Sequence, residues 1–356
     1  MSEAVLTPAE IVVVGAGMVA HRFVENLIST AETPIHVTVI GDEARHPYDR
    51  TGISGLFSGA TPEALELDRS VFEDFRVRFM ADDRVLRIDP GARTVMTRSR
   101  RIVGYDSLVL ATGSHAASVD IAGSDLRGCF GYRTLEDVQR LERFAYRRRN
   151  ELGRPLRGAV IGDGSLAIEA AGALQLLDVA PVVVQHSDLP TSATLVSEAR
   201  GFSFAGLLEA RGVAVRTESH GVRLAGDSSR AVGAVELGDG VEPVDLIVLA
   251  VGVRPRDELA RNASIGVDPR GGIVVDERCT TSDPRVFAIG DVASFEGRRA
   301  EALARGYAMA EVAAARILDV SAMSAPRDLL TTARGPLRPN APAAAGSPRV
   351  RALQAV

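Results

Sequence analysis

Two glycine-rich segments have the residue types and spacing that suit phosphate binding. "GAGMVA" (15–20) follows the apolar run "IVVV", and "GDGSLA" (162–167) follows "AVI". In such a segment the first Gly permits a tight turn and the second lets a pyrophosphate approach the backbone, while the small sixth residue lets helix and strand pack closely. Free N–H groups and the positive end of the helix dipole stabilise the phosphate charge. Each segment therefore predicts a dinucleotide-binding loop; its contact residues would be Gly15, Ala16, Gly17, Met18, Val19 and Ala20 in the first, and Gly162, Gly164, Ser165 and Leu166 in the second.

The two loops differ in the residue expected to meet the ribose. Asp42 ends the next strand-like run after the first loop, where an acid accepts hydrogen bonds from the ribose diol. After the second loop the run ends in Gln185 and His186. Gln also bonds a diol and lacks the repulsion that an acid exerts on a 2′-phosphate, so NAD and NADP both remain open. Asp163 adds an anion beside the second site and weakens binding if its side chain points inward.

The elements around these loops predict an α/β protein with two Rossmann-like domains. Short apolar runs followed by Gly turns favour buried parallel strands, and longer runs with helical periodicity favour helices. The expected strands are 11–15, 35–42, 105–114, 181–187, 244–255 and 285–294, and the expected helices are 18–30, 134–152 and 303–318. From about residue 321 the chain is rich in Pro, Ala, Gly and Arg, which predicts a disordered basic tail over 321–356.

Composition excludes several classes of function. The net charge of −5 does not suggest nucleic-acid or membrane-surface binding, and no apolar run approaches the roughly 20 residues of a membrane span. We expect a cytoplasmic protein, because no basic segment precedes an apolar run at the N-terminus. The two cysteines, Cys129 and Cys279, exclude a Cys-ligated iron–sulfur cluster within this chain. All 41 basic residues are Arg, so Schiff-base and P-loop chemistry are excluded, and no metal site is expected.

Several segments together resemble the pyridine-nucleotide reductases, flavoproteins with two dinucleotide-binding domains. The two glycine loops, "LVLATGS" and "VFAIGD" carry this likeness. A finer likeness is to the N-terminal flavoprotein part of assimilatory NAD(P)H nitrite reductase large subunits. It rests on segments spread over residues 11–318, among them "PYDRTGISGLFSG", "GSDLRGCFGYRTLED", "GVRPRDELA" and "RGGIVVDERCTTSDPRVFAIGD".

The resemblance implies a FAD-binding domain of residues 8–118 and 241–320, with a NAD(P)-binding domain of residues 119–240 inserted. Glu169 would lie near the nicotinamide carboxamide, although a surface helix Glu is the alternative. Asp291 would bond the ribityl chain or cap a helix, and the helix near Arg305 would point its N-terminus at the flavin. The remaining residues implied to meet a cofactor are Arg50, Ser54, Ala111, Thr112, Gly113, Gly252 and Gly290.

The resemblance also implies a function: hydride transfer from NAD(P)H to FAD, with electrons passed to a partner protein or small acceptor. Many relatives carry a Lys after the "YDR" segment, where this chain has Gly55. Alternatives are a sensory FAD-binding protein with a weakened nicotinamide site, and an NAD(P)H oxidase or quinone reductase. The family's usual third domain is missing, which favours a monomer. An arginine cluster would dock an acidic partner or form a solvated helix face: Arg140, Arg143, Arg147, Arg148, Arg149, Arg154 and Arg157.

Overall fold

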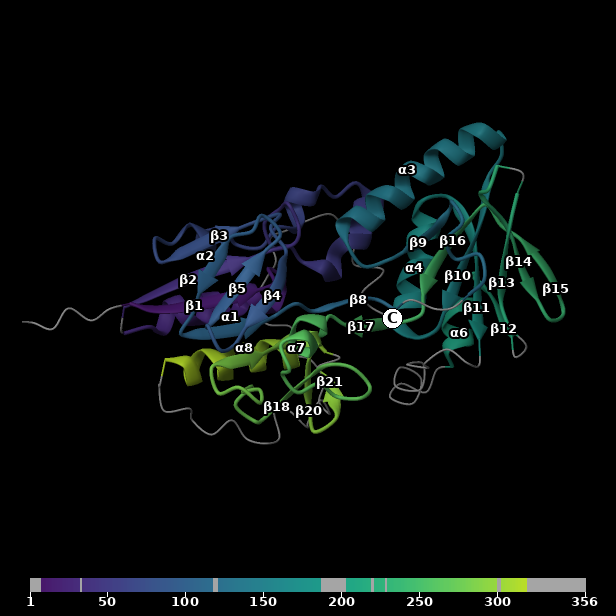
Figure 1. The fold of residues 1–356 in the computed structure, drawn as a ribbon. Coiled ribbons are helices and arrows are strands. Elements are labelled where there is room, and N and C mark those ends of the chain that lie inside the picture. The colour runs from purple at the N-terminus through teal and green to yellow at the C-terminus, as the bar shows by residue number, and fades with distance from the viewer. Residues whose placement is uncertain are drawn as a thin grey trace, which may run out of the picture.

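Two five-stranded sheets organise the chain (Figure 1). The computed structural model describes residues 8–32, 34–117, 121–186, 203–218, 221–227, 229–299 and 302–318. The first sheet has the strand order β19-β7-β1-β2-β3 and the second has the order β12-β11-β10-β16-β9. All strand pairs inside both sheets are parallel, as the uniformly apolar strand sequences predict.

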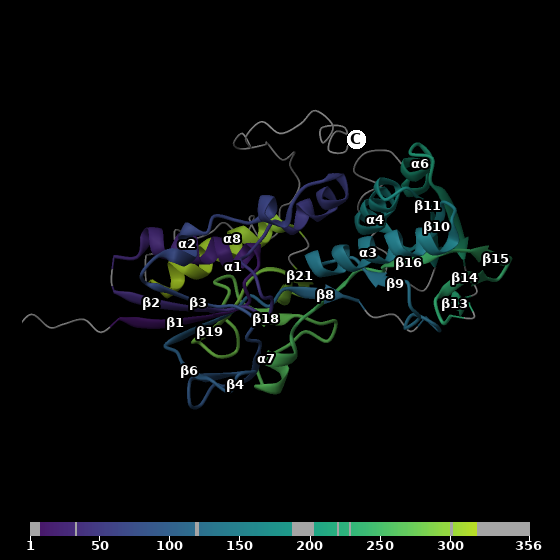
Figure 2. The same cartoon turned by 90° about the horizontal axis from the view of Figure 1, so that it is seen from above.

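The first sheet is built from strands far apart in the sequence. Its strands are β1 (Ala9–Val14), β2 (Ile35–Ile40), β3 (Val77–Met80), β7 (Ser107–Leu110) and β19 (Val286–Ala288). Helices α1 (Met18–Thr30) and α8 (Leu303–Ile317) pack together beside it (Figure 2). The buried core between these layers includes Val13, Phe23, Leu27, Val109 and Ala310, each fully shielded from solvent.

Smaller elements surround the first sheet. One group joins β2 to β3: η1 (Arg50–Ser58), η2 (Pro62–Leu65) and α2 (Ser70–Glu73). An antiparallel sheet joins β3 to β7: β4 (Val85–Asp89), β5 (Thr94–Thr97) and β6 (Ile102–Gly104). The C-terminal part adds α7 (Glu258–Asn262), β18 (Ile273–Val275), η3 (Gly290–Val292), β20 (Ala293–Phe295) and β21 (Arg298–Arg299).

The second sheet forms the other half of the molecule. Its strands are β9 (Cys129–Gly131), β10 (Leu156–Gly162), β11 (Val179–His186), β12 (Ala214–Glu218) and β16 (Leu246–Ala250). Among its described residues, this half contains the helices α3 (Leu135–Leu152), α4 (Gly164–Leu176) and α6 (Phe204–Glu209). A small antiparallel sheet follows, made of β13 (Arg223–Gly226), β14 (Val232–Leu237) and β15 (Gly240–Pro243).

The sheet membership of β16 corrects the expected domain boundary at residue 241. Leu246–Ala250 pairs with Gly158–Gly162 of β10, so this strand belongs to the second sheet and not to the first. The chain returns at β17 (Val253–Pro255), which pairs antiparallel with β8 (Ser114–Ala116). A buried apolar run shows that a strand is central in a sheet, but it does not show in which sheet.

Two further expectations need adjustment or lie beyond the described part. The single strand expected at 285–294 is divided into β19, η3 and β20, because Gly290 adopts a φ of +74°. The predicted tail at 321–356 lies outside the described residues. In the part of the chain that is described, no helix is long and apolar enough to cross a membrane.

The loop after β2 brings the two halves together. Helix η1 packs against both α3 and α4, and Tyr48, Ile53 and Leu56 share a buried apolar cluster with residues of those helices. The start of α3 is fixed locally. The Thr134 hydroxyl accepts a hydrogen bond from the Asp137 N–H, and the Asp137 carboxylate accepts from the Thr134 N–H, which is a capping box.

Candidate functional site

The first glycine loop lies at the carboxyl end of β1. Gly15 has a φ of +110°, and a Cβ built there would lie only 2.2 Å from the Ala111 carbonyl oxygen. No other residue type fits this close approach of two backbone segments. Gly17 caps α1, and a Cβ there would meet nothing within 4 Å. The side of the loop at the helix N-terminus is therefore open, as anion binding requires.

The second loop repeats this geometry at the end of β10. Gly162 has a φ of +144°, and a Cβ on it would lie 2.1 Å from the Ala250 carbonyl oxygen. Helix α4 begins at Gly164, and Asp163 at its N-cap is buried. The correspondence extends to the neighbouring strand, since Gly113 after β7 and Gly252 after β16 both have positive φ and open space at the Cβ position.

The predicted ribose residues occupy the equivalent strand ends. Asp42 follows β2, and its Oδ2 lies 3.4 Å from a guanidinium nitrogen of Arg256. Gln185 lies near the end of β11, opposite Thr217 of β12. Of the other first-loop residues, Met18 is the first residue of α1. The Val19 side chain packs on Gly290 and Gly306: a Cβ built on these glycines would lie 3.2 Å and 2.8 Å, respectively, from a Val19 methyl carbon.

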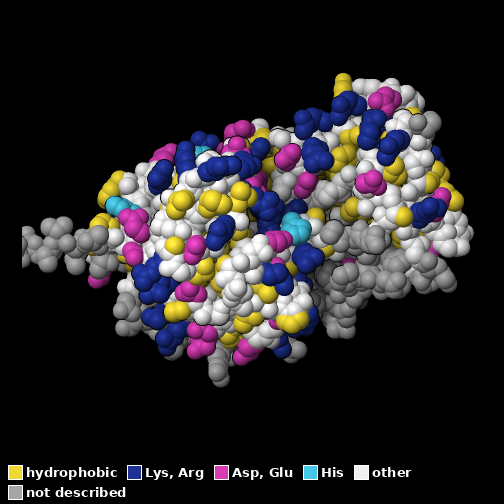
Figure 3. Space-filling view, viewed as in Figure 1, with side chains coloured by type: hydrophobic (Ala, Val, Ile, Leu, Met, Phe, Trp, Pro, Cys, Tyr) yellow, Lys and Arg dark blue, Asp and Glu magenta, His cyan; other side chains and the backbone are white. Residues whose placement is uncertain are grey.

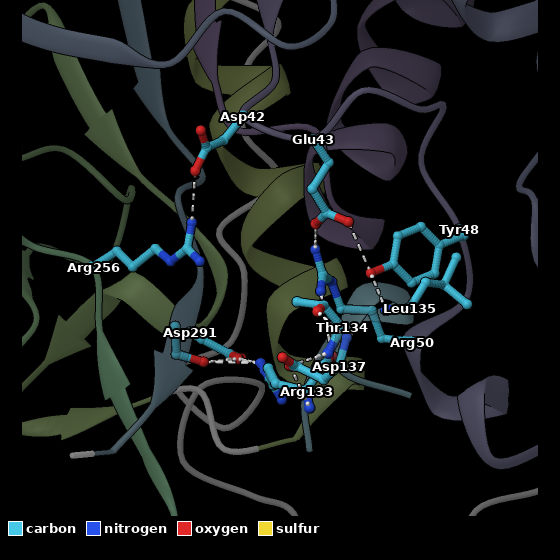
Figure 4. A network of polar contacts seen from close by, with 11 residues as sticks. Asp42, Glu43, Tyr48, Arg50, Arg133, Thr134, Leu135, Asp137, Arg256 and Asp291 are labelled. Atoms are coloured by element: carbon cyan, nitrogen blue, oxygen red, sulfur yellow. Dashed lines mark hydrogen bonds and ion pairs between the residues drawn. The ribbon is translucent and has the colours of Figure 1, made fainter. Parts of the chain in front are cut away.

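Asp291 and Arg133 form an ion pair that joins the two halves (Figure 4). The Arg133 guanidinium donates to Asp291 Oδ2 at 2.6 Å, and the Ser114 hydroxyl donates to the same oxygen at 2.8 Å. Sequence reasoning selected Asp291 but missed Arg133 and Ser114. The sequence signal that could have pointed to Arg133 is its position directly before Thr134, the N-cap of α3, because the cap fixes the backbone there.

A second network contains Arg50, another predicted residue. Its guanidinium pairs with Glu43 and donates to the Arg133 carbonyl oxygen at 3.4 Å. The Tyr48 hydroxyl donates to Glu43 at 3.0 Å and accepts from the Leu135 N–H at 3.2 Å. Burial raises the pKa of Tyr48 to about 12, so this hydroxyl keeps its proton. The network fixes η1 against the start of α3, and sequence reasoning missed Glu43 and Tyr48.

Glu169 lies on α4 beside Tyr132. Burial raises the pKa of the Glu169 carboxyl to about 7, against the opposing influence of the Tyr132 hydroxyl and the Arg133 guanidinium. Burial also raises the pKa of Tyr132, whose hydroxyl is close to both Glu169 and Ser54. The structure thus brings the predicted residues Glu169 and Ser54 together around a tyrosine that sequence reasoning missed. Glu169 is only partly exposed, which argues against a simple surface role.

Several buried polar atoms of these residues lack a hydrogen-bond partner, which is compatible with a polar cofactor. Buried polar groups normally have hydrogen-bond partners. Four buried atoms here have none within the described ranges: Arg133 Nε, Arg305 Nε, the Tyr132 hydroxyl and Glu169 Oε1. They offer hydrogen-bond donors and an acceptor to a polar group. Arg305 also donates to the Arg299 carbonyl at 3.0 Å. Its place in the first turn of α8, next to Gly306, brings it near Gly290.

The remaining candidates have structural partners or no visible role in the site. Burial raises the pKa of Cys129 to about 12 and also raises the pKa of Cys279, so neither is a reactive thiolate. No group of three or more His, Cys, Asp or Glu that could hold a metal ion occurs among the described residues.

The arginine cluster is only partly free. Basic side chains gather over α3 (Figure 3). Arg148 pairs with Asp227 at 2.6 Å and Arg154 pairs with Asp245 at 2.8 Å, so both have structural roles. The exposed members are Arg140, Arg143, Arg147, Arg154 and Arg157, and of these Arg154 holds the pair with Asp245. Docking of an acidic partner there stays a prediction for these exposed side chains.

This chain is similar in sequence to curated reductase subunits. The chain is 36% identical over 316 residues to the NADH nitrite reductase large subunit of Escherichia coli, covering 88% of this chain and 36% of that protein. It is 30% identical over 298 residues to the assimilatory nitrate reductase electron transfer subunit of Bacillus subtilis, covering 81% of this chain and 36% of that protein. The chain therefore spans about a third of the length of these relatives.

A solved structure and a family model agree with this likeness. The ferredoxin reductase of the CYP199A2 system from Rhodopseudomonas palustris superposes with a TM-score of 0.73 at 27% identity, covering 87% of this chain and 76% of that chain. The model for "Pyridine nucleotide-disulphide oxidoreductase" matches residues 9–316, nearly all of the described part. The resemblance expected from the sequence is confirmed, and the chain belongs to the pyridine nucleotide-disulphide oxidoreductase family.

Proposed function

We propose that this chain takes a hydride from NAD(P)H onto FAD and passes the electrons to a partner protein. Membership of the family implies an oxidoreductase with FAD and NAD(P)H as cofactors. The observation that carries the proposal is the duplicated loop. Gly15 approaches Ala111 as Gly162 approaches Ala250, so one chain contains two dinucleotide sites of the same construction.

The first loop suits FAD and the second suits NAD(P)H. Asp42 at the end of β2 is an acid of the kind that accepts ribose hydroxyls. Arg133 and Asp291 pair between the two halves, and we expect a flavin attached to the first loop to extend toward this pair. On this assignment the FAD domain comprises residues 8–117 and 253–318, and the NAD(P) domain comprises the second sheet with its helices.

The chain's own residues supply position and charge. When bound, FAD supplies the electron-accepting ring, and hydride transfer to it needs no acid or base from the protein. Arg133 holds a positive charge beside Asp291, and the N-terminus of α8 adds a positive dipole end, which favours negative charge nearby. Glu169 offers a carboxyl oxygen for the nicotinamide amide. The packing of η1 against α3 and α4 holds the two loops at a fixed separation.

Electron delivery to a partner protein is supported by the names of two relatives. The Escherichia coli and Bacillus subtilis relatives are named as a nitrite reductase subunit and as a nitrate reductase electron transfer subunit, and this chain matches about a third of each. We propose the corresponding role, an electron donor in nitrite or nitrate assimilation. The expected cytoplasmic location and monomeric state stay predictions.

Anaerobic reduction tests this function. The purified protein should show the visible bands of oxidised flavin, and adding NADH or NADPH without oxygen should bleach them. The nucleotide that bleaches faster identifies the preference that Gln185 leaves open. Oxygen, quinones and a ferredoxin are then compared as acceptors, and rapid reoxidation by the protein acceptor alone supports the proposal. A yellow protein that neither nucleotide bleaches indicates the sensory alternative, and a protein that takes up no FAD refutes the assignment.

A further inference from the structure

Arg256 is held by its backbone at the carboxyl end of β7. Its N–H donates to the Gly113 carbonyl at 3.0 Å, and its own carbonyl accepts from the Thr112 hydroxyl at 2.8 Å. The preceding residues Val253–Pro255 pair with β8, which continues from the same turn. Three sets of contacts therefore fix residue 256 beside the turn that ends β7.

The side chain of Arg256 reaches a different strand end. Its Nη1 lies 3.4 Å from Oδ2 of Asp42, which follows β2 (Figure 4). In the first sheet β1 lies between β7 and β2. Neighbouring strands are about 4.8 Å apart, so the side chain and its ion pair bridge roughly 10 Å across the end of β1. The loop from Gly15 to Gly17 starts at that strand end.

The bridge crosses the place where a dinucleotide must lie. A pyrophosphate bound at the N-terminus of α1 contacts the backbone at Gly17, and a Cβ on Gly17 or on Gly113 would meet nothing within 4 Å. A ribose bound to Asp42 needs an oxygen of the same carboxylate that Arg256 contacts. Entry or exit of the dinucleotide therefore requires the guanidinium to move.

The ion pair is weak enough to open. The Arg256 and Asp42 side chains are 34% and 36% exposed, so water screens their attraction. The backbone of Arg256 can stay anchored while its side chain moves, because the anchoring contacts involve only the main-chain atoms of Arg256 itself. Arg256 thus has a fixed backbone, a long cationic side chain and an acidic partner, Asp42, on the far side of the loop. We call this ion pair across the loop the strap.

We propose that Arg256 is a cofactor-retaining residue whose ion pair with Asp42 closes over FAD in the first loop. This inference rests on the proposed assignment of that loop to FAD. The strap must open for FAD to enter and to leave, so it slows both steps. Its guanidinium also places a positive charge near an anionic cofactor, which a neutral closing residue would not do.

Stopped-flow flavin fluorescence of apoprotein mixed with FAD measures both rates. We expect Arg256→Gln to raise the association and the dissociation rate constants by about fivefold each, the upper end for an ion pair of this exposure. Arg256→Lys, which keeps the charge, should give intermediate rates. Arg254→Gln is the matched control, because Arg254 is an exposed arginine on β17, two residues before Arg256. The rates of this variant should equal those of the unchanged protein.

The double variant Arg256→Gln with Asp42→Asn separates a strap from an independent contact. If the two side chains act together, Arg256→Gln changes the rates much less when Asp42 is already Asn. The strap is wrong if Arg256→Gln leaves both rates unchanged, or if it raises dissociation alone, which would make Arg256 an ordinary contact. Failure of the unchanged protein to bind FAD would instead refute the assignment of the loop, and with it the strap.

Discussion

Replacing Glu169 by Gln should remove a pH dependence that the buried carboxyl gives the protein. Burial raises the pKa of this group from 4.5 to about 7 in the folded state. Between those values the unfolded chain loses the proton while the folded chain keeps it. The free energy of unfolding therefore contains a favourable contribution below about pH 4.5, which is lost as pH rises through 7.

The size of this effect follows from the two pKa values. At about 1.36 kcal/mol per pH unit, the difference between 4.5 and about 7 corresponds to about 3 kcal/mol at most. Gln has nearly the same shape and stays neutral at every pH, so the variant does not lose this contribution. For a chain of this size about 3 kcal/mol corresponds to a change of roughly 4 °C in melting temperature.

Thermal unfolding of the FAD-loaded protein between pH 5 and pH 8 measures the effect through the release of fluorescent flavin. The melting temperature of the Gln variant, relative to the unchanged protein, should rise with pH. Glu142→Gln provides the control, because Glu142 is exposed on α3 and its replacement should shift the melting temperature equally at every pH. Parallel curves for the Glu169 variant and the unchanged protein would refute the argument that this carboxyl is protonated when folded.

The same titration should be visible in the reaction. A carboxyl with a pKa of about 7 divides between its protonated and ionised forms at neutral pH. Only the ionised form accepts hydrogen bonds with both oxygens. The rate at which NAD(P)H bleaches the flavin should therefore change between pH 6 and pH 8, and the Gln variant should lose this change. A pH profile that is unaltered in the variant would place the titrating group elsewhere.

Four further substitutions test the geometry of the loops and of the polar contacts. Gly15→Ala should abolish FAD uptake, because its Cβ would lie 2.2 Å from a carbonyl oxygen. Gly162→Ala should spare FAD uptake but prevent bleaching of the flavin by NAD(P)H. Gly172→Ala on α4 is the control for both spectra, because a Cβ there meets nothing within 4 Å. Arg133→Gln should weaken FAD binding about tenfold in a fluorescence titration, as loss of a charged hydrogen bond does, and unchanged binding would exclude a cofactor contact. Tyr48→Phe removes the hydroxyl that contacts Glu43 and Leu135, so it should cost about 1 kcal/mol, and an unchanged melting temperature would contradict this.

Local sequence signals were sufficient for the loops and most of the core elements. A positive φ or a close backbone approach requires Gly, and both conditions occur at Gly15 and at Gly162. The apolar runs before these residues are buried strands, as expected. Helix α1 occupies 18–30, the range that its periodicity predicted. Such features depend on a few neighbouring residues, which is why the sequence alone reveals them.

The missed features depend on contacts between distant segments. Arg133 meets Asp291 across 158 positions, and Arg256 meets Asp42 across 214 positions. Because the chain contains 41 arginines, residue type alone does not single out Arg133 or Arg256 as a site residue. The same limit explains the boundary at residue 241, since β16 reads as a central strand of either sheet until its pairing with β10 is known.

The two loops share a geometry but differ in what surrounds them, and this difference fits their proposed cofactors. Beside the first loop, charged side chains from four separate segments form two pairs: Asp42 with Arg256, and Asp291 with Arg133. Such contacts slow dissociation, which suits a cofactor that stays bound through many turnovers. At the second loop the ribose position is the uncharged Gln185. Because an oxidised nicotinamide nucleotide must leave after every hydride transfer, a weaker neutral contact there favours turnover. On the proposed assignment, the same loop geometry would serve a resident cofactor at the first loop and a diffusing substrate at the second, and the side chains at equivalent strand ends would make the difference.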